Sequence, residues 1–512
     1  MGVLCYAIVF VRSWRDLKKL ALCGFLAVAF SLASCSGPAT TMGNGSHGSS
    51  AGLIVALRST PMPLLGNANV LSFSATVVGV SLTPSTGGSV NVPLNSALYQ
   101  VDFTRLQSDT AFLALSTAIP AGTYTNMVVS LSNPAVTFCT QTHGIMGCEA
   151  ESIITLGGGP ATPIIAGAPF PLVVTHGQTT GLDVTVNIAK ALTVNVQTQA
   201  ITNVNLGAAD VLTAMILPPA SNTLPSGALD FIEDVTGIIS SVNTASQSIT
   251  IETATRGPIT AVAGTATTVS PNCTTFNLGS TFTCAKQGQV ASLEMTLNVD
   301  GTFRLLNYDP LAITAGDWIE GIVGLPPSSS TQFLLVTNDL VFHPSNSLIR
   351  SDLKLGDPVK ITLTNPQPFV VDTKGLIVPN TSFAGATDAS ILMPGQTLGV
   401  HVVSFMPASG ATVAAANVDF VYLRFTRVAG SVASVAPPNT FAMQSFPPFF
   451  GLTLPVTVQL SNVSPSTNFD GVNGAPDLVS GQAVSIRALY FGPPTGPTPT
   501  PTPFSAAKVR VP

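Results

Sequence analysis

The chain has 512 residues, with 19 Lys or Arg against 24 Asp or Glu, which gives a net charge of −5 at pH 7. Charged residues make up only 8% of the chain and no basic stripe is present, which argues against a nucleic-acid partner. The length is too great for a single hydrophobic core and predicts about three domains.

The first 34 residues have the order of charged and apolar residues that is typical of an export signal. Residues 20–32 are mostly apolar, but this run is too short to cross a bilayer comfortably. Four basic residues precede it: Arg12, Arg15, Lys18 and Lys19.

The segment Leu32-Ala33-Ser34-Cys35 resembles the lipobox of bacterial lipoprotein signal peptides. The resemblance implies that residues 1–34 are removed and that Cys35 is acylated, which would place the protein on a membrane. An ordinary signal peptide with a chance Cys and an uncleaved anchor are the alternatives. The residue after Cys35 is Ser36. By resemblance to lipoprotein sorting in bacteria with two membranes, an Asp there would signal retention at the inner membrane, so Ser36 favours the outer membrane. Removal of four basic residues and one acid would leave 15 basic and 23 acidic residues, a net charge of −8.

Residues 35–50 are small and polar, and we expect a flexible tether there. From 51 to 219 apolar and polar residues alternate, as at Leu71, Phe73, Ala75 and Val77, which predicts half-buried strands.

The segment 51–219 resembles the DUF4382 family of bacterial envelope proteins. The resemblance implies a β-sandwich and brings no catalytic residues. It lies in 70–84, 101–106, 119–133 and 175–188, and is most specific at Ala121-Gly122-Thr123-Tyr124.

A second pattern recurs toward the C-terminus, where a Gly followed by Asp or Gln precedes an alternating strand. These pairs are Gly316-Asp317, Gly356-Asp357, Gly395-Gln396 and Gly481-Gln482. The pattern resembles DUF5666, whose small β-barrels are OB-like and often occur in tandem. We therefore expect barrels at 228–345 and 427–512, and a divergent module at 346–426. The Pro/Thr-rich segment 492–503 is expected to form an extended loop before a last strand.

Four cysteines of the exported part form two close pairs, Cys139 with Cys148 and Cys273 with Cys284. In an oxidising compartment this spacing predicts two local disulfides. Zinc bound by Cys139, His143, Cys148 and Glu149 is the alternative for the first pair.

Motifs for catalysis are missing from the sequence: there is no Gly-x-Ser-x-Gly, His-Glu-x-x-His or Cys-x-x-Cys. We therefore predict a non-enzyme without cofactor or metal that binds a neutral glycan or an envelope protein. A purely structural envelope protein and a hydrolase are the alternatives. Trp318, between Asp317 and Glu320, is the candidate ligand-binding residue, with burial in a barrel wall as the other interpretation.

Overall fold

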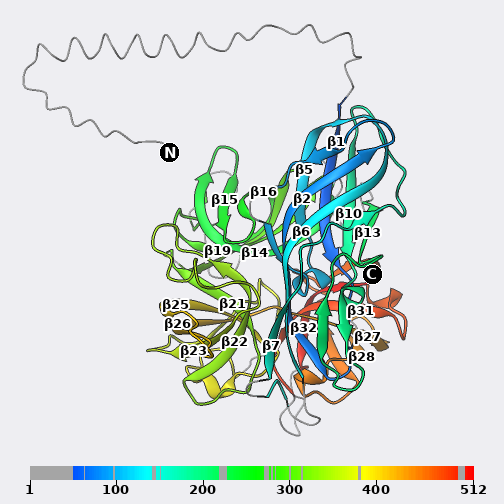
Figure 1. The fold of residues 1–512 in the computed structure, drawn as a ribbon. Coiled ribbons are helices and arrows are strands. Elements are labelled where there is room, and N and C mark those ends of the chain that lie inside the picture. Colours follow the sequence, from blue (N-terminus) through cyan, green and yellow to red (C-terminus); the bar gives the residue numbers. More distant parts are fainter. Residues whose placement is uncertain are drawn as a thin grey trace, which may run out of the picture. The chain divides into compact units, whose positions relative to one another are not determined.

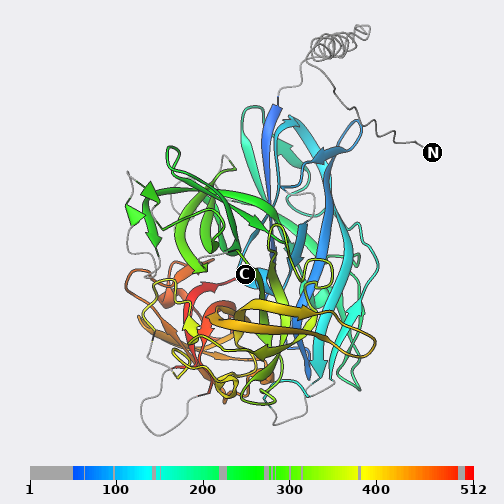
Figure 2. The same ribbon diagram turned by 90° about the vertical axis from the view of Figure 1, so that its left-hand side faces the viewer.

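The computed structural model describes residues 50–62, 64–95, 99–140, 146–149, 152–217, 228–269, 276–277, 281–282, 284–298, 301–312, 315–378, 382–493 and 502–512. Its regular structure is almost entirely strand, which confirms the all-β prediction (Figures 1 and 2). Among the described residues, the helical elements are one-turn segments: η1 (Arg105–Gln107), α2 (Ile188–Ala191), η2 (Ala389–Ile391), η3 (Pro448–Phe450) and η4 (Ala475–Asp477). In the described part of the chain, no helix combines the length and the apolar character needed to cross a membrane.

The N-terminal module is a β-sandwich whose two sheets enclose one hydrophobic core. One sheet has the order β13-β10-β1-β5, with β1 parallel to β10; the other is built on the long antiparallel pair β2 and β6. The first sheet comprises β1 (Ser50–Ser59), β5 (Ala111–Pro120), β10 (Thr179–Val186) and β13 (Leu212–Ile216). The second comprises β2 (Ala68–Pro84), β3 (Val90–Val92), β4 (Tyr99–Asp102), β6 (Gly122–Thr140), β7 (Ile153–Gly157), β8 (Ile164–Ile165) and β9 (Leu172–Val174), and β11 (Leu192–Val194) pairs separately with β12 (Ile201–Val204).

On β2, the apolar face is buried as the alternation predicts, but the polar face is buried as well. Phe73 and Val77 are buried in the sandwich core. Ser72, on the opposite face, is also fully buried, because a turn of a later module covers that face: Thr137 Oγ1 on β6 donates to Gly356 O at 2.7 Å. A strand expected to be half-buried is therefore covered on both sides here.

Three five-stranded barrels follow, and all have the same topology. Numbered within each barrel, the strands close in the order 1-2-3-5-4, with strands 3 and 5 parallel. The first barrel contains β14 (Ala228–Asn243), β15 (Ser248–Thr253), β16 (Gly257–Val269), β19 (Val290–Asn298) and β20 (Phe303–Ala312), with the small pair β17 (Phe276–Asn277) and β18 (Thr281–Phe282) beside it. The second contains β21 (Asp317–Val323), β22 (Gln332–Val341), β23 (Pro358–Leu363), β25 (Thr397–Met406) and β26 (Ala414–Arg424), with β24 (Val370–Val371) added to β26. The third contains β27 (Thr426–Ala436), β28 (Thr440–Gln444), β29 (Val456–Leu460), β31 (Ala483–Tyr490) and β32 (Phe504–Arg510), with β30 (Asn468–Asp470) added to β32.

One turn repeats before strand 4 of every barrel and explains the Gly-Gln pattern. Gly288, Gly395 and Gly481 have φ of +87°, +93° and +83°, a region that favours glycine. The Gln that follows each Gly accepts a hydrogen bond on Oε1 from the backbone N–H three residues before it. These bonds are Lys286 N to Gln289 (2.7 Å), Met393 N to Gln396 (2.9 Å) and Val479 N to Gln482 (3.0 Å).

The boundary between the first two barrels differs from the expected one at 345/346. β21 and β22 pair with β23 and β25, so the second barrel begins at Asp317 and the first ends with β20 at Ala312. The Gly-Asp signal misplaced this boundary, because it precedes strand 1 of the second barrel at Gly316 and strand 3 at Gly356. The segment expected to be divergent is therefore the larger part of a complete barrel.

At the C-terminus, β32 is the last strand of the third barrel, as predicted. It pairs antiparallel with β31 and parallel with β29 and β30. Most of the Pro/Thr-rich loop before it, residues 494–501, lies outside the described residues.

Candidate functional site: an inter-module charge cluster and a cleft

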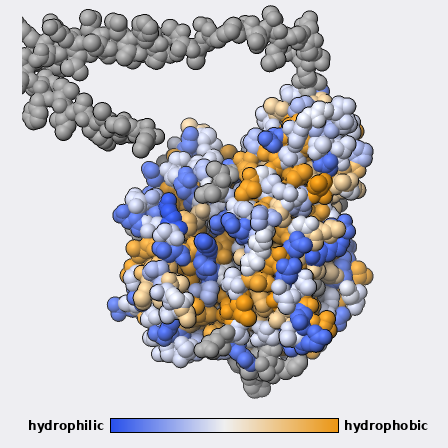
Figure 3. All heavy atoms as spheres, viewed as in Figure 1, coloured by the Kyte–Doolittle hydropathy of each residue, from blue (hydrophilic) through white to orange (hydrophobic). Residues whose placement is uncertain are grey.

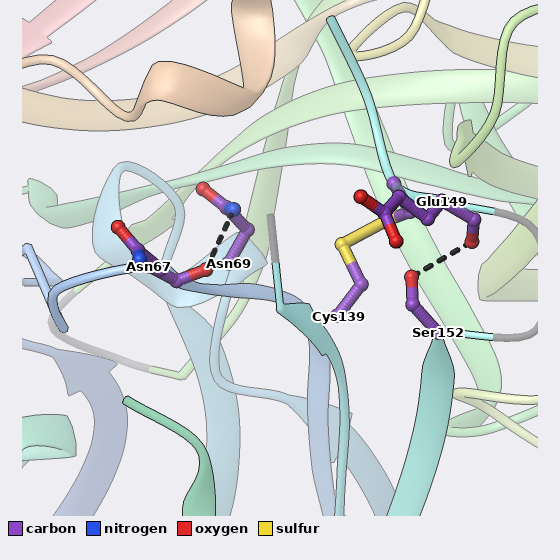
Figure 4. The surroundings of a disulfide bond; sticks show 6 residues. Asn67, Asn69, Cys139, Glu149 and Ser152 are labelled. Atoms are coloured by element: carbon purple, nitrogen blue, oxygen red, sulfur yellow. Dashed lines mark hydrogen bonds between the residues drawn. A yellow bond between two sulfur atoms is a disulfide. The ribbon is translucent and has the colours of Figure 1, made fainter. Parts of the chain in front are cut away.

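Of the residues that the sequence singled out, Cys35, His143 and Cys273 lie outside the described residues. Cys139 and Cys148 form the expected disulfide, with their Cα atoms 5.7 Å apart (Figure 4). Cys284 is disulfide-bonded as well, and its pairing with Cys273 stays a prediction.

The Cys139–Cys148 disulfide lies where three modules meet. Both cysteines are almost fully buried and belong to a hydrophobic cluster with residues of the third barrel. Next to the bridge, Cys148 N donates to Gly324 O (2.9 Å) and Gly147 N donates to Phe449 O (2.8 Å). Within the described part of the chain, no group of three His, Cys, Asp or Glu could hold a metal ion. The burial of the Cys139–Cys148 disulfide among three modules favours a structural bridge over a zinc site.

Trp318 is only 4% exposed and packs in the wall of the second barrel. Its ring lies 5.4 Å from the ring of His401 and 5.6 Å from that of Tyr422, and the Tyr422 hydroxyl donates to Leu311 O of the first barrel (2.6 Å). A sugar could stack on Trp318 only if these neighbours moved. The structure thus agrees with the burial interpretation, and the candidate binding surface must be sought elsewhere.

Among the described residues, charged side chains gather in a buried cluster of ion pairs around Glu320 on β21. Three arginines approach its carboxylate: Arg105 Nη1 at 2.9 Å from Oε1, Arg424 Nε at 2.9 Å from Oε2 and Arg427 Nη1 at 3.6 Å from Oε1. Arg105 comes from η1 of the sandwich, Arg424 from the end of β26, and Arg427 from the start of β27. One carboxylate therefore joins the sandwich, the second barrel and the third barrel.

The same cluster extends into the first barrel. Arg424 forms an ion pair with Asp372 and donates to Thr236 Oγ1 (3.0 Å) and Ser292 Oγ (3.2 Å) of the first barrel. Lys374 Nζ also donates to Ser292 Oγ (2.9 Å) and lies 3.8 Å from Asp309. Arg487 of the third barrel pairs with Glu294 of the first.

A second group of charges joins the third barrel to the sandwich. Arg510 Nε lies 2.7 Å from Asp470 Oδ2, and Arg510 also donates to the backbone of η1 and the residues after it. Burial alone would raise the pKa of Asp470, but attraction by Arg510, Lys508 and Arg58 outweighs it and holds this pKa well below its usual range. Asp470 is therefore ionised throughout the physiological range.

Asp339 and Asp102, two other buried carboxyls, have their pKa shifted upward. Burial raises the pKa of Asp339 although Arg105 lies nearby, 3.1 Å from its Oδ2. Burial also raises the pKa of Asp102, against hydrogen bonds from Thr104, Ser72 and Phe73. A carboxyl group with a raised pKa can be a catalytic acid, but only where a cavity next to it can hold a substrate.

The cavity next to Glu320, Asp339 and Arg424 measures only about 10 Å³. A single water molecule needs about that much, so a substrate has no access to these groups in this conformation. The arrangement can hold modules together, and it offers no reacting atom a place within hydrogen-bond reach.

A cleft of about 680 Å³ lies between the sandwich, the first barrel and the second barrel. Apolar side chains from β14 and β22 and from the segment after β22 line its walls: Ile238, Ile239, Leu340, Phe342 and Leu353. Its polar groups include Gln100 on β4, Glu252 on β15, and Arg350 and Lys354 before β23. Neither the alternation nor the turn motifs pointed to this cleft, because its walls come from three modules.

No model of a known protein family matches this chain, and no curated protein matches its sequence.

Proposed function

We propose that this protein is a lipid-anchored lipoprotein of the bacterial envelope, on the outer membrane, that binds or scaffolds a partner without catalysing a reaction. The kinship with DUF4382 and with tandem DUF5666 modules is part of this proposal. The identical strand order of the three barrels supports it.

The observation that carries the proposal is the ion-pair cluster around Glu320. Arginines from three modules approach one buried carboxylate, and side chains of the first barrel complete the cluster. A cluster of this kind links the modules, because removal of Glu320 takes away the one buried carboxylate that charges of three modules share. Modules linked in this way suit a protein that presents a surface to a partner.

The surface of the described residues favours an uncharged partner. Only five Lys or Arg are exposed there: Lys190, Lys286, Arg350, Lys354 and Lys360. Figure 3 shows apolar residues interspersed with weakly polar and strongly hydrophilic ones on the face in view. A neutral glycan or an exposed strand of another envelope protein is therefore the partner we propose.

The test uses the full chain, extracted from membranes with detergent and immobilised. Neutral envelope glycans and envelope proteins are passed over it at low and at high salt. We expect saturable binding that changes little with salt. A fall in affinity of about a hundredfold at high salt, of the size seen when many phosphates are neutralised, would contradict the neutral partner. Absence of binding would favour the purely structural alternative, and turnover of a chromogenic ester or glycoside that one carboxylate substitution abolishes would favour the hydrolase.

A further inference from the structure

We propose that the cleft between the sandwich and the first two barrels binds an anionic amphiphile, specifically a long-chain fatty acid. This site is separate from the partner-binding role above and does not depend on it.

The size and lining of the cleft fit an apolar chain. Its volume of about 680 Å³ falls within the range of ligand pockets, about 300–1,000 Å³. Ile238, Ile239, Leu340 and Leu353 in its walls are only 1–4% exposed, so the accessible apolar surface comes from the half-buried Ala254 and Phe342 and the exposed Pro344. Phe342 is a poor platform for a sugar, because the Arg350 guanidinium lies over its ring, 5.3 Å from the centroid.

The exposed cations gather at this cleft although the surface has few charges. Of the five exposed Lys and Arg among the described residues, Arg350 and Lys354 line the cleft and Lys286 adjoins it through Gln287. Among the residues that line the cleft, Arg350 and Lys354 face one acid, Glu252, so the lining itself carries a net charge of plus one; Lys286, Asp352 and Asp357 adjoin it. An acyl chain against the apolar wall would place its carboxylate near Arg350 and Lys354.

Both cations are exposed, unlike those of the buried cluster, although the carboxylate of Asp357 attracts Lys354. Arg350 Nη2 donates to the carbonyl oxygen of His343 (3.1 Å), which leaves its other N–H groups for a ligand. The backbone N–H of Lys354 donates to Asp357 Oδ2 (2.8 Å), and burial raises the pKa of Asp357 against the attraction of Lys354. A bidentate contact from Arg350 to a carboxylate would be the stronger of the two.

The experiment measures binding of dansyl-labelled undecanoic acid to the full chain by fluorescence titration, with the methyl ester of the same probe as the neutral analogue. We expect one saturable site for the acid and binding of the ester that is weaker by about tenfold or more, since a hydrogen bond to a charged group is lost. Arg350→Gln with Lys354→Gln should weaken binding of the acid by a similar factor and leave binding of the ester unchanged.

Two further variants separate this site from non-specific uptake. Ser351→Trp, at an exposed position in the lining, should block binding of both probes. Lys190→Gln with Lys360→Gln removes two exposed cations that do not line the cleft and should change nothing. Equal affinity for acid and ester, unchanged binding in the Arg350/Lys354 variant, or displacement of the probe by a neutral glycan would overturn the proposal.

Discussion

Arg105 Nη1 lies 2.9 Å from Glu320 Oε1, although 215 positions separate the two residues in the chain. Their side chains are only 3% and 7% exposed. The pair connects η1 of the sandwich to the first strand of the second barrel, and Arg424 and Arg427 approach the same carboxylate. Each arginine also pairs with a second carboxylate, that of Asp339, Asp372 or Asp109, and Glu320 is the partner that all three share.

Replacing this carboxylate should destabilise the whole chain. We expect Glu320→Gln to lower the free energy of unfolding by about 3–5 kcal/mol, the usual cost of removing one partner from a buried ion pair. Denaturant unfolding measures this. Asp210→Asn, which removes an exposed partner of Lys190, is the control and should cost less than about 1 kcal/mol. Equal effects of the two substitutions would contradict a structural role for the cluster.

Stability should also depend on pH through Asp470. Its pKa is lower in the folded protein than the value of about 3.9 in an unfolded chain, so its ionisation stabilises the fold above that value. The stabilisation is lost as the pH falls through the folded pKa. Asp470→Asn should therefore be clearly less stable than the native chain at pH 7, and the difference should shrink below about pH 4. A difference that is constant from pH 7 to pH 3 would exclude this linkage.

The strand pattern and the class of fold could be predicted from the sequence, whereas the charge cluster could not. Alternation at Phe73 and Val77 depends only on neighbours in the chain, and the Gly-Gln turns are local as well. The partners of Glu320 instead come from three distant segments, and nothing near Arg105 or Arg424 in the sequence indicates them. The cleft could not be predicted for the same reason. The start of the second barrel at Asp317 was not predicted because a Gly followed by Asp or Gln precedes strands 1, 3 and 4 of that barrel, so the motif does not mark where a module begins.

Removal of the Cys139–Cys148 bridge should reduce stability without unfolding the chain at room temperature. The bridge spans nine positions, and the chain-entropy model gives about 2.5–3 kcal/mol for a loop of this length. Denaturant unfolding of Cys139→Ser with Cys148→Ser checks the value. Mass mapping of non-reduced peptides tests both predicted bridges, and a free thiol at Cys273 would contradict the second.

The proposed anchor predicts how the protein partitions. Cys35→Ala should leave an unprocessed or soluble protein, because no thiol remains at the acylation position. Membrane fractionation with and without the substitution measures this. Full partition of the variant into membranes after removal of the signal would contradict acylation at Cys35. Native protein found only in the inner membrane would contradict sorting to the outer one.

The central claim is that the four β-modules form one rigid body held together at Glu320, and calorimetric unfolding of the full chain tests it most directly. The native protein should unfold in a single transition whose calorimetric and van't Hoff enthalpies agree. Glu320→Gln should split this transition or lower its midpoint by several degrees, as the modules lose their common contact. Separate transitions for the sandwich and the barrels in the native chain, unchanged by Glu320→Gln, would contradict the account.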